Sequence, residues 1–187
     1  MIKNIFSILL VTIAFSFSDL SFAQAADTLE DRLSKELVRL GFKDGMLPPL
    51  SKAFGPYEPY VVVDKDIYLT SSAPQRPDGT WIKGLVTDEA KLEDLIYAAE
   101  LSCVSAINRL KYAAGGDLNN IGKIIHVNTL SPAPYNYPHL EILADVTANM
   151  FVRVFGNEVG GHARTILAIT SLPVNMTHEI DVRAALK

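Results

Sequence analysis

The chain has 187 residues, 49% of them hydrophobic, and carries a formal net charge of −4 at pH 7. That charge, with no basic block along the chain, argues against binding to the phosphate backbone of nucleic acids, so we expect no nucleic-acid partner. The length is enough for one domain with a hydrophobic core and short for two.

The first 25 residues have the pattern of a secretory signal peptide. An early lysine is followed by an apolar stretch at about 5–17 and by the small residues Ala23 and Ala25. The apolar stretch is shorter than the roughly 20 residues that span a bilayer, and Asp19 follows it, which argues against a permanent anchor. We therefore predict cleavage after Ala23 or Ala25 and a periplasmic or secreted protein with no stable membrane anchor.

Cysteine and histidine usage gives no sign of a disulfide or a metal site. Cys103 is the only cysteine, and its spacing from Ala99, Ala106 and Leu110 places it on an apolar helical face, which favours packing over a nucleophilic role. No two histidines are four residues apart, as a helical metal site requires. We expect neither a metal nor an organic cofactor. The four histidines are His126, His139, His162 and His178.

The N-terminal part of the mature chain predicts a helix, an arm and a hairpin. Leucines recur at three- and four-residue steps in 27–42, which is typical of an amphipathic helix. The stretch 43–60 is rich in proline and glycine and predicts an ordered connector. Residues 60–63 and 67–70 predict two strands joined by a turn at 64–66.

The remainder alternates long helices with strands. We predict helices at 87–114 and 139–155, a strand at 123–130, and two final strands at 164–170 and 176–183 joined across 171–175. This order favours an α+β domain in which two long helices pack on one face of a mostly antiparallel sheet. The opposite face would need cover for its apolar residues, which suggests oligomerisation through the sheet.

Arg164 and Glu179 are the candidate catalytic residues. Side chains alternate along a strand, so pairing of Thr170 with Thr177 across the last turn would place both over one surface. A guanidinium suits a substrate carboxylate, and a glutamate can position or deprotonate a water molecule. The alternative is a cross-strand Arg–Glu pair that only joins the two strands.

Several segments together resemble one protein family. The stretches FGPYEPYVVV, IYLTSSAPQRPDG and HARTILAITSLPVN, followed by HEIDV, resemble the RidA/YjgF family of imine deaminases, also labelled endoribonuclease L-PSP. The similarity runs over 47–187 and includes the order of elements. Residues 26–46 would be an extra N-terminal helix and arm, as in the longer members of that family.

The resemblance implies a chorismate-mutase-like fold assembled as a homotrimer with clefts between subunits. Family members hydrolyse 2-imino acids, or their enamine tautomers, to 2-oxo acids and ammonia without a cofactor. By position, Arg164 would bind the substrate carboxylate, Glu179 would orient water and Tyr57 would close over the cleft. Thr70 takes the place of a family serine, and we include its neighbour Ser71 and the neighbour of the arginine, Thr165, as substrate-binding residues.

Three further positions depart from the family pattern. Ser71 stands in place of a glycine, Ile166 in place of a frequent cysteine, and Asp145 in place of an asparagine on the second long helix. Ser71 adds a side chain where the backbone would approach the ligand, and Asp145 would repel a carboxylate.

Two other functions stay open. The same cleft could hold a small carboxylate without turning it over, in a trimeric binding protein or a chaperone-like protein. The ribonuclease activity attributed to some family members is disfavoured by the negative net charge.

Overall fold

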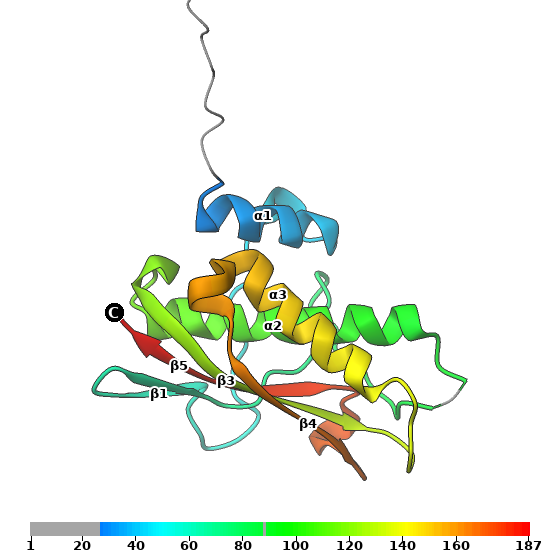
Figure 1. Cartoon of the computed structure of the whole chain (residues 1–187). Helices are drawn as coiled ribbons and strands as arrows, with labels where there is room; N and C mark the ends of the chain where they lie inside the picture. The colour runs from blue at the N-terminus through cyan, green and yellow to red at the C-terminus, as the bar shows by residue number, and fades with distance from the viewer. Residues whose placement is uncertain (1–26, 88) are drawn as a thin grey trace, which may run out of the picture.

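A computed structural model describes residues 27–87 and 89–187, and the predicted signal peptide lies outside these residues. The elements form three layers: a short helix, two long helices and a sheet (Figure 1). The α+β class and the two long helices on one face of the sheet are thereby confirmed. The elements are α1 Leu29–Arg39, β1 Tyr60–Val63, β2 Asp66–Leu69, α2 Leu92–Ala113, β3 Ile121–Pro132, α3 Leu140–Gly160, β4 Ala163–Ile169 and β5 Glu179–Leu186, with short 3-10 turns at Lys43–Gly45, Leu118–Asn120 and Pro173–Asn175.

The sheet is mostly antiparallel, as predicted, with the strand order β1-β2-β5-β3-β4. The predicted β1–β2 hairpin forms, but its turn is at 64–65 and β2 begins at Asp66, one residue earlier than expected. The strands β3 and β4, which are joined through α3, run parallel. A parallel neighbour needs such a long crossover, whereas an antiparallel one does not.

The expected pairing of the last two strands is wrong. β3 lies between β4 and β5, so Thr170 and Thr177 are not cross-strand neighbours. The burial patterns explain the order. Residues of β4 are mostly exposed, as at a sheet edge, whereas β5 buries Ile180, Val182 and Ala184 on one face. The strand β5 also begins at Glu179, three residues later than predicted. Met176 and Thr177 instead form backbone contacts with residues 82–83.

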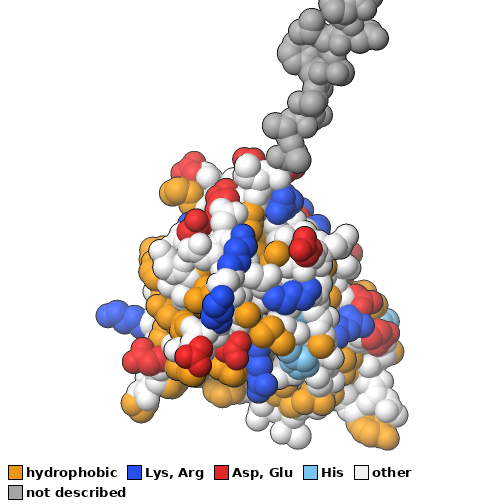
Figure 2. Space-filling model, turned by 60° about the vertical axis from the view of Figure 1, so that its left-hand side comes forward, with side chains coloured by type: hydrophobic (Ala, Val, Ile, Leu, Met, Phe, Trp, Pro, Cys, Tyr) orange, Lys and Arg blue, Asp and Glu red, His pale blue; other side chains and the backbone are white. Residues whose placement is uncertain are grey.

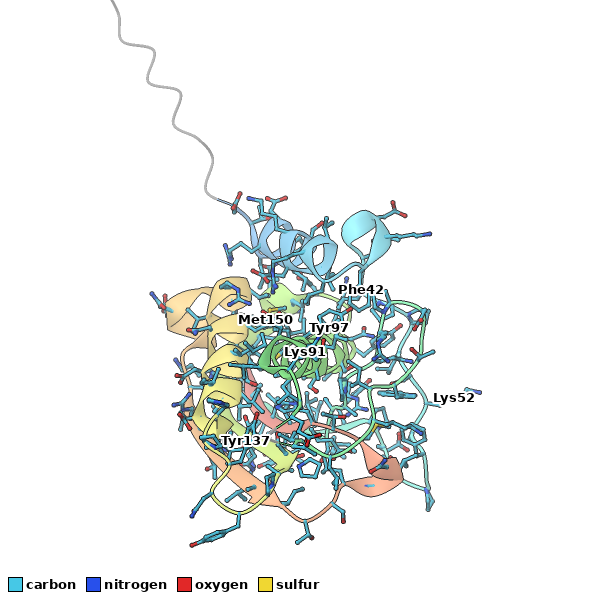
Figure 3. The ribbon with its side chains drawn as sticks, turned by 90° about the vertical axis from the view of Figure 1, so that its right-hand side faces the viewer. Phe42, Lys52, Lys91, Tyr97, Tyr137 and Met150 are labelled. Atoms are coloured by element: carbon cyan, nitrogen blue, oxygen red, sulfur yellow. The ribbon has the colours of Figure 1, made fainter. Side chains whose placement is uncertain are left out.

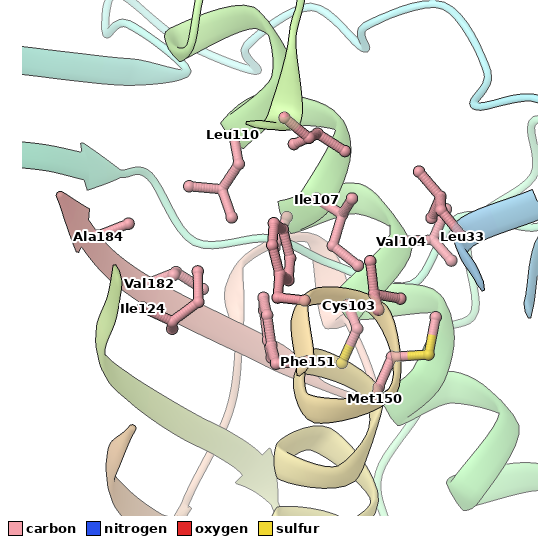
Figure 4. Close-up of a cluster of buried hydrophobic side chains, with 14 of the residues drawn as sticks. Leu33, Cys103, Val104, Ile107, Leu110, Ile124, Met150, Phe151, Val182 and Ala184 are labelled. Atoms are coloured by element: carbon pink, nitrogen blue, oxygen red, sulfur yellow. The ribbon is translucent and has the colours of Figure 1, made fainter. Parts of the chain in front are cut away.

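The main core lies between the sheet and the two long helices. Ile180, Val182 and Ala184 of β5 meet Ile107 of α2 and Phe151 of α3, all of them 1% exposed or less. Figure 4 shows the labelled side chains of this group converging from the two helices and the sheet: Ile107, Phe151, Val182 and Ala184. Their burial places the alternate residues of β5, among them Glu179, on the other face of the sheet.

The helix α2 begins at Leu92, five residues after the predicted start, and ends at the expected place. Cys103 is fully buried on this helix, and burial raises the pKa of its thiol. The prediction of a packing cysteine is confirmed. Of the helices within 27–87 and 89–187, none is long and apolar enough to cross a membrane.

The extra helix α1 is fixed to the long helices by an ion network. Thr28 and Asp31 form a capping box at its start, and Leu33 and Leu37 are buried beneath it. Glu100 of α2, only 7% exposed, accepts hydrogen bonds from Arg39 of α1 and Arg153 of α3.

Two further contacts complete this attachment. Glu36 of α1 also binds Arg39 and Arg153, and these hydrogen bonds outweigh the effect of burial and lower the pKa of its carboxyl. The hydroxyl of Tyr97 donates to the carbonyl of Leu40 at 3.1 Å, on the side of the molecule shown in Figure 3.

The other face of the sheet carries no long helix (Figure 1). On this face Tyr68 is 42% exposed and Leu167 is 49% exposed. Three consecutive valines of the edge strand β1 are exposed by 37–55%: Val61, Val62 and Val63. On the face drawn in Figure 2, basic and acidic side chains are interspersed, so no block of one sign gathers there.

Candidate active site

A cavity of about 440 Å³ opens where β5 begins, and we name it the Glu179 cavity. Its wall is built from the arm before β1, the segment after β2, helix α2 and the turn before β5. The lining residues are Lys52, Ala53, Phe54, Tyr57, Thr70, Ser71, Ala73, Trp81, Arg109, Pro173, Val174, Met176 and Glu179. Four of the predicted site residues thus lie together: Glu179, Tyr57, Thr70 and Ser71.

A larger hollow of about 580 Å³ lies elsewhere, beside Val86 and Pro134. Glu89 is the one ionisable side chain among its described lining residues. The Glu179 cavity combines a carboxylate, a guanidinium, a phenol and two hydroxyls, and is therefore the better candidate for chemistry.

The carboxyl of Glu179 is held in a partly buried position. Burial raises its pKa to about 6, and the nearby negative charge of Asp181 acts in the same direction. Arg109 and the Ser71 hydroxyl act in the opposite direction. A carboxyl with a pKa near 6 is ionised at neutral pH and still basic enough to accept a proton, which suits a general base.

The segment after β2 joins the cavity to the sheet. Ser72 exchanges backbone hydrogen bonds with Ile180, N–H to carbonyl at 2.8 and 3.0 Å. The hydroxyl of Ser71 donates to Asp181 at 2.5 Å, and that of Thr70 donates to the carbonyl of Glu58 at 2.6 Å. The side chain that Ser71 adds in place of the family's glycine is therefore tied to Asp181.

Tyr57 stands at the rim and is 46% exposed. Its hydroxyl oxygen accepts the backbone N–H of Phe54 at 3.1 Å, which leaves the hydroxyl hydrogen available to a ligand. The ring of Phe54 meets that of Trp81 edge to face, with centroids 5.5 Å apart. The rim is thus an aromatic wall with one polar group.

Arg109 of α2 is the residue of this cavity that the sequence analysis missed. It is 7% exposed, and its Nη1 donates to the carbonyls of Thr70 and Ser71 and to the hydroxyl of Ser72. A signal for it existed: Arg109 follows Ala106 by three residues, so it falls on the buried face of the helix. A charged side chain on the buried face of a helix is uncommon and therefore indicates a specific structural or functional role.

Arg164 and Thr165 do not line the Glu179 cavity. Arg164 points to the helix side of the sheet, where Nη1 forms an ion pair with Asp145 of α3. The expected common surface for Arg164 and Glu179 is therefore wrong, because they occupy opposite faces of the sheet. Thr165 lies on the open face, 3.2 Å from the Nε2 of His126.

Asp145 was expected to repel a substrate carboxylate if it lined the cleft. In the structure its charge neutralises that of Arg164. Within one chain, the guanidinium of Arg164 is therefore compensated and directed away from Glu179.

His178 is a core histidine, as its place in the strand pattern predicted. It is 1% exposed, its Nδ1 lies 3.0 Å from the hydroxyl of Ser102, and burial lowers its pKa to about 3. It stays neutral at physiological pH and cannot act as a proton donor to the cavity. The described residues contain no group of three His, Cys, Asp or Glu side chains placed to hold a metal ion.

The turn that closes the cavity contains a strained residue. Val174 has a φ of 56°, and Asn175 follows with a φ of 62°. Asparagine tolerates this left-handed region, whereas a β-branched side chain does not. Backbone strain of this kind is often found at functional sites. Val174 is part of the wall of the Glu179 cavity.

Comparison with solved structures defines the class of fold. The structure of a "putative endoribonuclease" from Shewanella oneidensis matches with a TM-score of 0.73 and 24% identity, over 86% of this chain and all of that one. A Yersinia pestis protein of the conserved Rid family, YyfA, matches with a TM-score of 0.52 and 20% identity, over 72% of this chain and 90% of that one. The chain therefore has the α+β, chorismate-mutase-like fold of the Rid and endoribonuclease L-PSP proteins.

Two further similarities cover most of the chain. The Agrobacterium tumefaciens protein Atu1372, of unknown function, is 26% identical with a TM-score of 0.72, over 85% of this chain and 96% of that one. Protein TCP17 of Trypanosoma cruzi is 24% identical over 150 residues, which are 80% of this chain and 91% of that protein. No protein-family model matches the chain.

Proposed function

We propose that the protein hydrolyses 2-imino acids, or their enamine tautomers, to 2-oxo acids and ammonia in the Glu179 cavity, without a cofactor. The observation that carries this proposal is the carboxyl of Glu179, whose pKa is raised to about 6 in a cavity that also holds Arg109 and Tyr57. The fold shared with Rid proteins supports the same reaction class.

The chemistry requires orientation more than activation, because an imine carbon is already electrophilic. Ionised Glu179 accepts a hydrogen bond from water and directs its oxygen to the imine carbon. The new carbon–oxygen bond forms as one water proton passes, by way of Glu179, to nitrogen and gives a carbinolamine. The second water proton, now on the hydroxyl, then passes to nitrogen as the carbon–nitrogen bond breaks, so that the carbonyl forms and ammonia leaves. Tyr57, Thr70 and Ser71 line the cavity and would hold the planar substrate.

We further propose that the chain belongs to the longer members of the RidA/YjgF family, with the extra helix. The helix α1, which is joined to α2 and α3 through Glu100 and Glu36, supports this proposal. A homotrimer would cover the open face of the sheet. In such an assembly Arg164 and Thr165 could serve the cavity of a neighbouring copy, a role that stays a prediction.

The test is ammonia release from imino acids generated in the assay. An amino-acid oxidase with catalase forms the imine from alanine or leucine, and a trap such as semicarbazide reports the imine that survives. The protein, expressed as the full chain, should lower the trapped imine, and Glu179→Gln should abolish this effect. Glu93→Gln, an exposed carboxyl on α2, is the matched control. An unchanged imine lifetime with the wild-type protein contradicts the proposal.

A second candidate is a carrier that binds a small carboxylate without turnover. The aromatic rim and the buried guanidinium of Arg109 favour it, because these residues serve binding without any step that Glu179 would carry out. Binding of 2-oxo acids together with an unchanged imine lifetime would support this function.

A further inference from the structure

Arg109 has one free edge. Its Nη1 is occupied by two carbonyls and a hydroxyl, but its Nε is buried without a partner and its Nη2 donates to no described residue. Nε and Nη2 form one edge of the planar guanidinium, the edge that can bind a carboxylate through two parallel hydrogen bonds. Arg109 is one of the residues that line the Glu179 cavity.

The charge of Arg109 also lacks a direct partner. Among the ion pairs of residues 27–87 and 89–187, none includes Arg109. Glu179 and Tyr57 act on it only through space. A cation that is 93% buried is costly without a counter-charge, and a bound anion would supply one.

The other cations near the site are less suitable. Lys52 belongs to the lining, but its side chain extends outward from the arm in Figure 3. Arg164 is paired with Asp145 and lies on the other face of the sheet.

We propose that Arg109 binds the carboxylate of a 2-imino or 2-oxo acid in the Glu179 cavity, so that one chain supplies both the anion anchor and the glutamate. The choice of ligand rests on the proposed function. Phe54, Trp81 and Met176 line the same cavity, which favours acids with an apolar side chain. The carboxylate thus lies at the α2 wall, and the side chain lies against the aromatic rim.

Trp81 provides a direct measurement, because it is the only tryptophan of the chain and it lines the cavity. Its fluorescence is titrated with 4-methyl-2-oxopentanoate and with the methyl ester of that acid, which lacks the charge. We expect the wild-type protein to bind the acid about tenfold more tightly than the ester, as for one lost charged hydrogen-bond pair. Equal affinities would overturn the inference.

Variants then assign the preference to a residue. Arg109→Gln should bring the two affinities to within about twofold, and Arg109→Lys should restore part of the preference. Arg32→Gln is the matched control, because Arg32 also donates to backbone carbonyls but lies on α1, away from the cavity. A preference that survives in folded Arg109→Gln overturns the assignment.

A second variant keeps the test decisive if Arg109→Gln fails to fold. The double variant Lys52→Gln, Arg164→Gln removes the other two cations, both of which are exposed. A retained preference supports Arg109, and a lost preference overturns the inference. These titrations need no turnover, so a preference for the acid without imine hydrolysis would refute the enzyme and leave the Arg109 assignment standing.

Discussion

Glu179 and Asp181 point to the same side of β5, and the negative charge of Asp181 adds to burial in raising the pKa of Glu179. Ser71 donates to Asp181 and so ties this carboxylate to the segment that lines the cavity. The Ser71 hydroxyl thus acts on both carboxylates: it donates to Asp181, and it opposes the rise in the pKa of Glu179 that burial causes.

The rate of imine hydrolysis should follow the ionisation of Glu179. Since its pKa is raised to about 6, kcat/KM is expected to rise with pH through that value and to level off above it. Buried His178, with a pKa of about 3, does not contribute in this range. The profile is measured between pH 5 and 8 with semicarbazide trapping, at about one-unit steps or finer. A flat profile would show that Glu179 is not the base.

Ionised Glu179 should also lower the free energy of unfolding at neutral pH. Its folded-state pKa of about 6 lies above the ordinary 4.5, so the stabilising contribution of the neutral carboxyl is complete below pH 4.5 and lost as the pH rises through 6. Glu179→Gln should therefore raise the free energy of unfolding by roughly 1 kcal/mol at pH 8, allowing for solvent screening, and by little at pH 4.5. Urea unfolding at both pH values checks this. An equal effect at both values would point to packing instead.

The strained turn predicts a second stabilising substitution. Val174 has a φ of 56° and is 50% exposed, so little burial is lost when it is replaced. Val174→Asn should raise the free energy of unfolding by about 1 kcal/mol because asparagine tolerates this conformation. Val174→Thr keeps the branch at Cβ and should bring no such gain. Equal gains from the two variants would contradict a conformational cause.

The network beneath α1 predicts the opposite effect. Glu100→Gln removes the carboxylate that accepts from Arg39 and Arg153 in a nearly buried position. We expect a loss of about 1–3 kcal/mol in the free energy of unfolding, since the arginines keep part of their hydration. Glu93→Gln on the same helix, where the side chain is exposed, should change it by less than about 0.5 kcal/mol. Thermal or urea unfolding of both variants separates the two.

The sequence alone predicted the helices and strands but did not predict the order of the strands in the sheet. Periodicity and turn residues located the helices and the β1–β2 hairpin because these depend on neighbours along the chain. The place of β5 between β2 and β3 depends on which strands can tolerate an edge, a property of the whole sheet. Direct pairing of β4 with β5 would place Arg164 and Glu179 on one surface, and this expectation is wrong because β3 lies between the two strands.

The site was predicted in part for the same reason. The resemblance named Glu179, Tyr57, Thr70 and Ser71, and these four residues line one cavity, whereas Arg164 and Thr165 do not line it. Arg109 lay outside those segments, and only the folded chain shows that its guanidinium reaches the carbonyls after β2. Its position on the buried side of a helix was the available clue.

The valines of β1 have a consequence for handling the protein. An unpaired outer strand with three adjacent apolar side chains offers backbone donors and acceptors to any similar strand. Isolated chains should therefore adhere to one another as their concentration rises, independently of catalysis. A lysine in place of Val62 would be the simplest way to keep preparations monodisperse.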